Sequence, residues 1–351
     1  MTQHRVLITG VGGNVGQGVV KSLRAGKLCY NIVGIDMEPM SAGFAFSDKM
    51  HIVPRTGSSE FGPEIENILR RDRPEAIFVC SPTELEYFSL NQDVIKKTWE
   101  TTVLVNPIKV IHVGSDKLLT SEFLRDRGFP WLPTVMANDD RGVDQLIRDV
   151  GFPLIVKPRK GFSSHNVFLV DSRAEIEAVR NLVQDVIVQR YVPGDDEYTA
   201  GTLSGWDGRV RAVIILHRHL IQGTTYRTEL VLDDKIRNMM VTIVEALGAT
   251  GPCNIQFRMQ GGEVYVFEIN PRFSGTTGIR YIYGFNDAEL AFELLHIGKD
   301  IEQPELNHAV VLRYWNEVVL SNVDFTSVRE GRFNCRANQV SLNISDGWIN
   351  S

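Results

Sequence analysis

The run Phe267-Glu268-Ile269-Asn270-Pro271-Arg272 places a carboxylate, an amide and a guanidinium at every second position. Side chains two residues apart on a strand project from the same face, so Glu268 and Asn270 offer oxygen atoms on one side. Mg²⁺ prefers oxygen ligands, usually one or two carboxylates together with phosphate oxygens. Arg272, two residues further, can reach a carboxylate or an acyl phosphate. The alternative is a polar strand end with one solvated acid, but an acid on an otherwise apolar strand needs a partner.

Gln256 joins this cluster only if the hairpin connecting it to Glu268 has an unusual register. The two strands flank Gly261-Gly262, and a plain two-residue turn would set Gln256 opposite Phe267, on the wrong face. We therefore predict a three-residue loop or a β-bulge, which the glycines would tolerate. With that register, Gln256, Glu268 and Asn270 form an oxygen-rich cluster suited to Mg²⁺.

Small and hydroxyl-bearing residues follow Arg272, and a second arginine, Arg280, comes shortly after. Such a loop can admit an acid substrate, and Arg280 can pair with a second carboxylate. The alternative, a helix-capping turn followed by a solvated arginine, stays open. The loop positions predicted to contact substrate are Ser274, Gly275 and Thr276.

A glycine-rich loop near the start favours a different chemistry. The stretch from Thr9 to Gly16 fits TGxxGxxG between a strand and a helix, and Asp36 ends the next strand. This arrangement is typical of dinucleotide-binding folds, in which the acid holds a ribose. However, no tyrosine is followed by lysine four positions later, so the catalytic pair of short-chain dehydrogenases is missing. The glycines can equally serve close packing of the first helix on the first strand.

The Glu268 run resembles the ATP-grasp superfamily, and most closely the synthetase components of the carbamoyl phosphate synthetase large subunit. The run matches the family's E-[IV]-N-P-R strand end, and Gly251-Pro252-Cys253-Asn254-Ile255-Gln256 matches its G-x-x-N-x-Q-like strand. The resemblance extends over the chain up to about residue 300. It implies that Gln256, Glu268 and Asn270 bind metal, and that Gln256 and Glu268 also belong to the nucleotide site. The implied cofactors are ATP and two Mg²⁺ ions, with Mn²⁺ as a substitute.

Upstream segments agree with the family in order and spacing. Ser115-Asp116-Lys117 matches the D-K pair that opens the ATP-grasp lid region, which implies that Lys117 contacts phosphate. Residues 151–158 look like the G-[FY]-P-x-[IV]-[IV]-K-P strand, which implies that Lys157 reaches the α and β phosphates. The next residues resemble the small-residue loop over the triphosphate, although they contain less glycine than is usual. The implied loop residues are Lys160, Ser163 and Ser164, and the implied catalytic charges are Arg272, Lys157 and Lys160.

Residues 188–198 resemble the family's hinge segment, E-x-[YF]-[IV]-x-G-x-E-[YF]. In relatives, backbone groups of this hinge read the adenine edge, and its second acid accepts hydrogen bonds from the ribose hydroxyls. That acid is Glu197 here, and the alternative for it is an exposed turn acid. Arg190 stands where many relatives carry a glutamate, which leaves the adenine contacts open. The implied hinge contacts are Gln189, Arg190, Tyr191 and Val192.

The elements that must position these residues are of two kinds. Continuous apolar strands alternating with helices over the first residues predict a buried parallel sheet, whereas strands predominate after Glu197. We expect an α/β fold, α+β in its second half, with an N-terminal Rossmann-like parallel sheet followed by a two-part ATP-grasp domain. The expected boundaries are 1–112 for the first domain, 113–190 for the lid, 191–304 for the metal-binding part and 305–351 for a strand-rich extension.

Composition limits the partners. A net charge of -6 excludes the basic footprint of sequence-independent nucleic-acid binding. No apolar run approaches the ~18 residues of a membrane span, and the start of the chain does not read as a signal peptide, so we expect a cytoplasmic protein. The four cysteines form no CxxC pair, which argues against a zinc site and a disulfide framework. The oligomeric state stays open, a homodimer included.

The sequence thus predicts a ligase that activates a carboxylate as an acyl phosphate, transfers it to an amine-type nucleophile and releases ADP and phosphate. Three alternatives remain. They are bicarbonate and ammonia chemistry as in carbamoyl phosphate synthetase, an NAD-dependent oxidoreductase, and a nucleotide-binding protein without catalysis. The expected partners are small-molecule carboxylate and amine substrates, whose identity the sequence does not specify.

Overall fold

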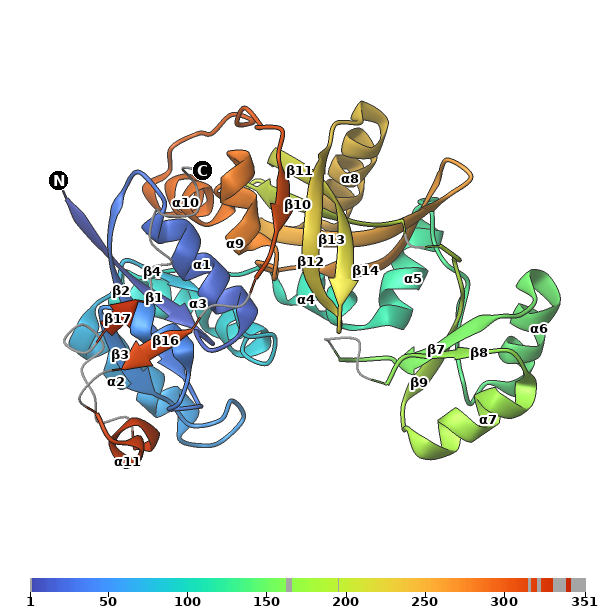
Figure 1. The fold of residues 1–351 in the computed structure, drawn as a ribbon, viewed down its shortest axis with the longest axis horizontal. Coiled ribbons are helices and arrows are strands. Elements are labelled where there is room, and N and C mark those ends of the chain that lie inside the picture. The colour runs from blue at the N-terminus through green and yellow to red at the C-terminus, as the bar shows by residue number, and fades with distance from the viewer. Residues whose placement is uncertain are drawn as a thin grey trace, which may run out of the picture. The chain divides into compact units, whose positions relative to one another are not determined.

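The computed structural model describes residues 2–161, 166–194, 196–314, 317–320, 323–330 and 339–341 (Figure 1). The chain forms two compact units. Unit 1 combines Met1–Asn106, Arg272–Asn307 and Arg313–Ser351, and unit 2 combines Pro107–Pro271 with His308–Leu312. Among the described residues, no helix has both the length and the apolar character that a membrane crossing requires.

Unit 1 is built on a five-stranded parallel sheet in the order β3-β2-β1-β4-β5. The chain winds from β1 to one side and then returns to the other side of β1, as in doubly wound folds. Its strands are β1 (Gln3–Thr9), β2 (Cys29–Asp36), β3 (Lys49–Ile52), β4 (Ala76–Phe78) and β5 (Thr102–Leu104). Its first helical segments are α1 (Asn14–Arg24), η1 (Ala42–Phe46), α2 (Phe61–Asp72) and α3 (Leu85–Trp99).

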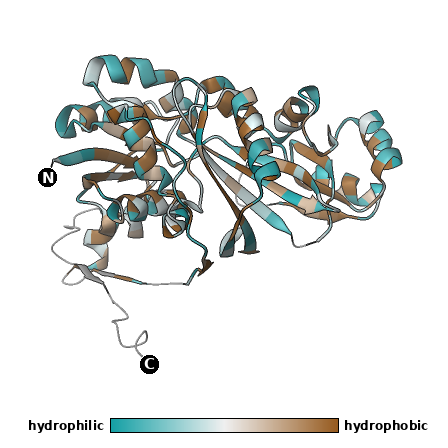
Figure 2. Cartoon of the chain, turned by 90° about the horizontal axis from the view of Figure 1, so that it is seen from above, coloured by the Kyte–Doolittle hydropathy of each residue, from teal (hydrophilic) through white to brown (hydrophobic). Residues whose placement is uncertain are grey.

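The later part of the chain returns to unit 1 with short elements. In Figure 2 the helices carry hydrophilic and hydrophobic positions side by side, as expected for helices with one buried face. These later elements are α9 (Thr277–Arg280), η2 (Tyr281–Tyr283), α10 (Asp287–Phe292), the π-helical η3 (Glu293–Ile297), β16 (Val318–Leu320), α11 (Phe325–Arg329) and β17 (Gln339–Ser341).

Unit 2 opens with two helices and a four-stranded antiparallel sheet in the order β6-β9-β7-β8, which contains the segment predicted to form the lid. The side chain of Asp116 caps α5 by accepting from the backbone N–H groups of Leu118 and Leu119. The elements are α4 (Ile108–Ser115), α5 (Lys117–Asp126), β6 (Thr134–Met136), α6 (Asp140–Val150), β7 (Leu154–Pro158), β8 (Phe168–Val170), α7 (Arg173–Leu182) and β9 (Val186–Arg190).

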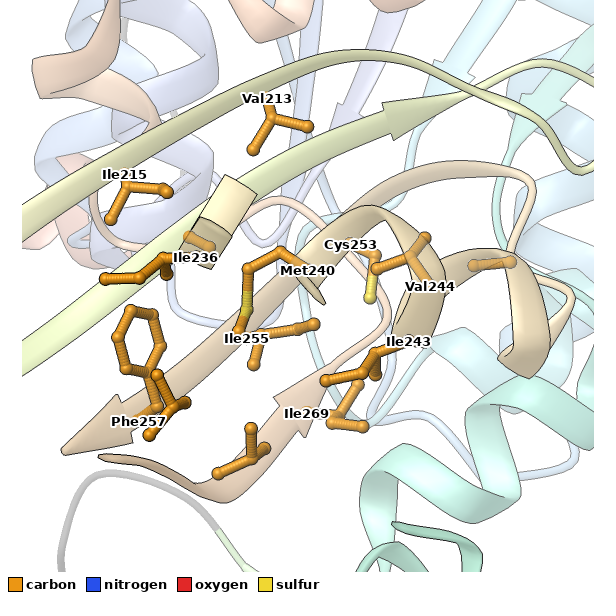
Figure 3. Packing of buried hydrophobic residues seen from close by; sticks show 14 of the residues in the cluster. Val213, Ile215, Ile236, Met240, Ile243, Val244, Cys253, Ile255, Phe257 and Ile269 are labelled. Carbon is orange, nitrogen blue, oxygen red and sulfur yellow. The ribbon is translucent and has the colours of Figure 1, made fainter. Parts of the chain in front are cut away.

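The rest of unit 2 is a six-stranded antiparallel sheet in the order β14-β13-β10-β11-β12-β15 (Figure 1). One face packs on α8, where Met240 and Ile243 meet Ile255 of β13 and Ile269 of β14 (Figure 3). The opposite face carries the polar residues of the candidate site. The elements are β10 (Glu197–Ser204), β11 (Val210–Ile221), β12 (Thr224–Val231), α8 (Asp234–Leu247), β13 (Gly251–Gln260), β14 (Glu263–Asn270) and β15 (Val310–Leu312).

The predicted fold class is confirmed, with a parallel sheet first and antiparallel sheets later. Several strands were missed, most of them short, and the longest is β12, which follows β11 through a tight turn. Its residues Thr224 to Val231 alternate between polar and apolar only weakly, so the period-two signal is faint.

Close backbone packing accounts for the glycine loop of unit 1. A Cβ at Gly16 would lie 2.3 Å from the carbonyl oxygen of Gly10, so α1 can begin against the loop only with glycine there. The carboxylate of Asp36 accepts from the backbone N–H of Gly12 at 2.7 Å and from that of Glu38 at 3.0 Å. Asp36 therefore fastens the loop to the end of β2, and these contacts favour the packing interpretation over a ribose-binding acid.

We expect Gly16→Ala to lower the free energy of unfolding by roughly 1–3 kcal/mol, because the added methyl overlaps backbone that cannot rotate away. Gly13→Ala is the matched control, since a Cβ there would meet its nearest atom at 3.5 Å, an ordinary contact. Urea unfolding of both variants measures the difference. Equal stability of the two variants would contradict the packing explanation.

Candidate functional site

A β-bulge between β13 and β14 sets the register of the candidate site. Gln260 pairs with Glu263 across the two-glycine turn, and Phe257 pairs with Val266. The register then shifts by one residue, so that Gln256 pairs with Glu268. Phe267 is the extra residue. The bulge that the sequence analysis required is confirmed, and it brings the predicted metal ligands onto one face.

Glu268 is half-buried and has no hydrogen-bond or ion-pair partner among the residues that the structure describes. Two lysines nevertheless act on it electrostatically, Lys117 at the start of α5 and Lys157 on β7. Asn270, two residues on, pairs with Asn254 across the hairpin. The described residues contain no group of three His, Cys, Asp or Glu side chains that could hold a metal. A hard cation that uses one carboxylate, amide oxygens and phosphate, such as Mg²⁺, fits this donor set better than zinc does.

Lys157 is a buried lysine without a carboxylate partner. Burial, and to a smaller extent the charge of Lys117, lower the pKa of its ammonium to about 8, against the opposing effect of Glu268. Its Nζ donates to Oε1 of Gln189 at 2.8 Å, and Nε2 of Gln189 donates to Oγ1 of Thr134 at 2.8 Å. The Nζ also lies 5.8 Å from the ring centroid of Phe267. The ammonium thus contacts an amide oxygen and an aromatic ring, both neutral, and an anionic ligand would stabilise its charged form.

Lys117 is the first residue of α5. Its Nζ donates to the carbonyl of Gly161 at 2.9 Å, and burial lowers the pKa of its ammonium. The preceding Asp116 forms an ion pair with Arg159 at 2.8 Å in addition to capping α5. Lys160 is exposed and forms an isolated β-bridge with Asp116. The predicted contacts Ser163 and Ser164 lie outside the described residues.

Glu197, the predicted ribose acid, is buried between two arginines that the sequence analysis missed. Nη2 of Arg218 donates to its Oε1 at 2.6 Å, and Nη2 of Arg258 donates to its Oε2 at 3.1 Å. The same Nη2 of Arg218 also donates to Oε1 of Gln256 at 2.8 Å. The alternation of side chains along β11 and β13 could have shown that both arginines lie on the face of Gln256. It does not show which strands are neighbours.

The predicted hinge residues are the last residues of β9 and the two residues after it. The backbone N–H of Arg190 donates to the carbonyl of Pro133 at 3.0 Å, and its guanidinium lies 4.8 Å from the ring centroid of Tyr265. Val192 is buried, and its carbonyl accepts from Nη1 of Arg258 at 2.9 Å. Tyr191 is half-buried. The guanidinium at position 190 thus stacks on an aromatic ring of β14, which gives it a packing role in place of the acid of many relatives.

The predicted substrate loop lies in unit 1. Ser274 and Thr276 are buried and share a hydrogen bond between hydroxyls at 2.7 Å. The carbonyl of Gly275 accepts from Nη2 of Arg313 at 2.7 Å. Nη1 of Arg272 donates to the carbonyl of Phe273 at 2.8 Å. Substrate binding by these residues stays a prediction.

Arg280 has a structural partner within unit 1. Its Nη1 lies 2.7 Å from Oδ2 of Asp287, and both side chains are almost fully buried. Thr277 donates to the same oxygen at 3.0 Å. Burial raises the pKa of the Asp287 carboxyl, against the effect of Arg280. The open alternative of a solvated arginine is wrong, and its predicted pairing with a substrate carboxylate would compete with this internal ion pair.

Comparisons with known proteins agree with this geometry. A family model described as "ATP-grasp in the biosynthetic pathway with Ter operon" matches residues 182–318, which include the hinge and the bulged hairpin. N5-carboxyaminoimidazole synthetase from Staphylococcus aureus, solved in complex with ADP, has a TM-score of 0.71 at 15% identity, with 97% of this chain and 93% of that chain covered. These comparisons show that the chain has the ATP-grasp fold.

Two further comparisons show how much of known proteins this chain matches. The large chain of carbamoyl phosphate synthase from Pyrococcus furiosus is 22% identical over 285 residues, which cover 75% of this chain and 26% of that protein. The chain thus spans about a quarter of the length of that curated relative. L-amino acid ligase from Bacillus licheniformis has a TM-score of 0.65 at 18% identity, with 85% of this chain and 75% of that chain covered. At these identities, the likeness to solved structures shows the ATP-grasp fold.

The lowered pKa of the buried Lys157 predicts a pH dependence of stability. Because the pKa of Lys157 is lowered on folding, the unfolded state binds more protons between about pH 8 and pH 10.5, and stability rises with pH in that window. Replacing it with an uncharged residue of similar length removes this contribution. From pH 7 to pH 9.5, we expect the free energy of unfolding of the wild type to gain about 2 kcal/mol relative to Lys157→Met.

Urea unfolding at the two pH values measures this gain. Lys235→Met, which removes an exposed lysine of α8, is the matched control and should change in parallel with the wild type. If Lys157→Met and the wild type respond equally to pH, the ammonium of Lys157 is not desolvated.

Proposed function

We propose that the chain is an ATP-dependent ligase that joins a carboxylate to an amine-type nucleophile. The observation that supports this most directly is that Glu268, which the bulge sets opposite Gln256, interacts electrostatically with two lysines of unit 2, Lys117 at the start of α5 and the buried Lys157 of β7. One unpaired acid beside two ammonium groups suits a magnesium-bound triphosphate, because the cation occupies the acid while the lysines hold the phosphates.

The proposed reaction has two steps. A carboxylate oxygen of the acid attacks the γ-phosphorus of ATP, the bond to the bridging β,γ-oxygen breaks, and ADP leaves. The nitrogen of the neutral amine then attacks the acyl carbon, phosphate leaves with the bonding electron pair, and the nitrogen loses a proton to solvent. The protein contributes position and charge, and no covalent enzyme intermediate is needed.

Each residue of the site has a task in this proposal. Lys117 and Lys157 offset charge on the triphosphate, and Gln189 holds the Lys157 ammonium in place. Glu268 and Asn270 would hold Mg²⁺, which supplies Lewis-acid polarisation of the phosphoryl oxygens. The remaining contacts stay predictions from the sequence: Glu197 for the ribose, the hinge backbone for the adenine, Lys160 with Ser163 and Ser164 for the phosphates, and Arg272 with Ser274, Gly275 and Thr276 for the acid.

The similarity to carbamoyl phosphate synthase large chains favours a second candidate, in which bicarbonate is the acid and ammonia the nucleophile. The same residues would serve it, because bicarbonate is also phosphorylated on oxygen. The chain spans about a quarter of that relative, and the activity named for the relative is that of the whole protein. We place an organic acid first and bicarbonate second. We also infer small-molecule substrates, with a homodimer as the assembly to test.

We expect Glu268→Gln to reduce ADP formation at least ~100-fold in the presence of a pool of carboxylic acids and amines, because the isosteric amide removes the only unpaired carboxylate charge of the site. Coupled detection of ADP measures the rate. Glu263→Gln is the matched control, since Glu263 is an exposed acid at the turn end of the same strand.

Circular dichroism and the melting temperature establish that both variants are folded. A folded Glu268→Gln protein that forms ADP at the wild-type rate would refute the assignment of Glu268. Stabilisation of the wild type by NADH and not by Mg-ATP in a thermal-shift measurement would favour the oxidoreductase alternative instead.

A further inference from the structure

Arg218 lies inside the candidate nucleotide site and has no role in the function proposed above. It lies on β11, which pairs with β10 so that Arg218 stands directly across from Glu197. Its side chain is only 8% exposed, and Nη1 also donates to Oγ1 of Thr225 on β12 at 3.3 Å. A guanidinium stays protonated in proteins. A permanent positive charge is therefore fixed on the polar face of the sheet.

The position of this charge matters because of Gln256. The Oε1 atom of Gln256 is the only atom of that side chain that can bind a hard cation, and it accepts from Nη2 of Arg218 at 2.8 Å. A divalent ion on the same oxygen would stand against the guanidinium at close range, in a setting with little solvent to screen the repulsion. The contact thus opposes metal binding at Gln256, whereas Arg218 forms no hydrogen bond or ion pair with Glu268 among the described residues.

The charges of the remaining metal-ligand candidates also favour a single ion at Glu268. Glu268 is the one carboxylate of the proposed metal cluster, since Gln256 and Asn270 are neutral. Glu197 is not available to a second ion, because each of its oxygens accepts from an arginine. One carboxylate with an amide oxygen and phosphate oxygens suffices for one octahedral Mg²⁺. Gln256 and Asn270 add no negative charge that would balance a second ion.

We propose that Arg218 takes the place of one of two divalent cations, so that the site binds a single metal ion with the triphosphate, at Glu268 and Asn270. The guanidinium then supplies on the Gln256 side the charge that a second ion would supply. This inference rests on the proposed function, since it presupposes a nucleotide at this site. It replaces the expectation of two ions, which assumed that the oxygen of Gln256 was free.

Metal counting tests the proposal without any turnover. The protein is saturated with the β,γ-imido analogue of ATP and titrated with Mn²⁺, and manganese retained with the protein is counted by ultrafiltration and electron paramagnetic resonance. We expect one analogue-dependent Mn²⁺ per wild-type chain. The double variant Arg218→Gln/Gln256→Glu removes the guanidinium and adds a carboxylate, and we expect it to retain two.

Arg211→Gln is the matched control, because it makes the same substitution on the same strand at a residue paired with Asp207 outside the site. It should retain one ion. Two ions on the wild type would overturn the inference and leave the proposed function standing. One ion on a double variant that circular dichroism shows to be folded would also overturn it. Absence of analogue binding to the wild type would contradict the proposed function and this inference together.

Discussion

One extra residue in β14 determines which side chains the candidate site contains. The two-glycine turn alone would place Gln256 opposite Phe267, and the bulge moves it opposite Glu268. Because side chains alternate along a strand, a shift of one residue reverses the face of every position beyond it. The displaced residue is itself used, since the ring of Phe267 lies beside the ammonium of Lys157. The bulge thus links the predicted metal ligands to Lys157.

The face assembled in this way combines buried positive charge with few internal counterions. The ammonium groups of Lys157 and Lys117 donate to neutral oxygens, of Gln189 and of a backbone carbonyl. The carboxylate of Glu197, by contrast, accepts from two arginines. Burying ammonium groups is unfavourable unless an anion arrives, and the lowered pKa of Lys157 reflects that penalty. A site that accepts this penalty before its ligand binds is preorganised for an anion such as a triphosphate.

The glycine loop of unit 1 shows that one sequence motif can have two physical explanations. Its glycine loop has the spacing of a dinucleotide fingerprint, and its glycines are required because backbone atoms approach within contact distance. The acid that would bind a ribose in the dinucleotide interpretation accepts hydrogen bonds from the loop and its own strand end. Glycine spacing alone reports close approach of the backbone, and the partner in that approach is a matter of tertiary structure.

The sequence alone determined the fold class, most strand and helix positions and the need for an irregular hairpin, because these depend on the local periodicity of apolar residues and on turn length. Tertiary structure decided which side chains meet. Arg218 contacts both Glu197 and Gln256 only because β10 lies between β11 and β13, and Arg280 is paired because α10 returns to α9. Hydrogen bonds between strands and across helices depend on strand order and register, which local sequence patterns do not encode.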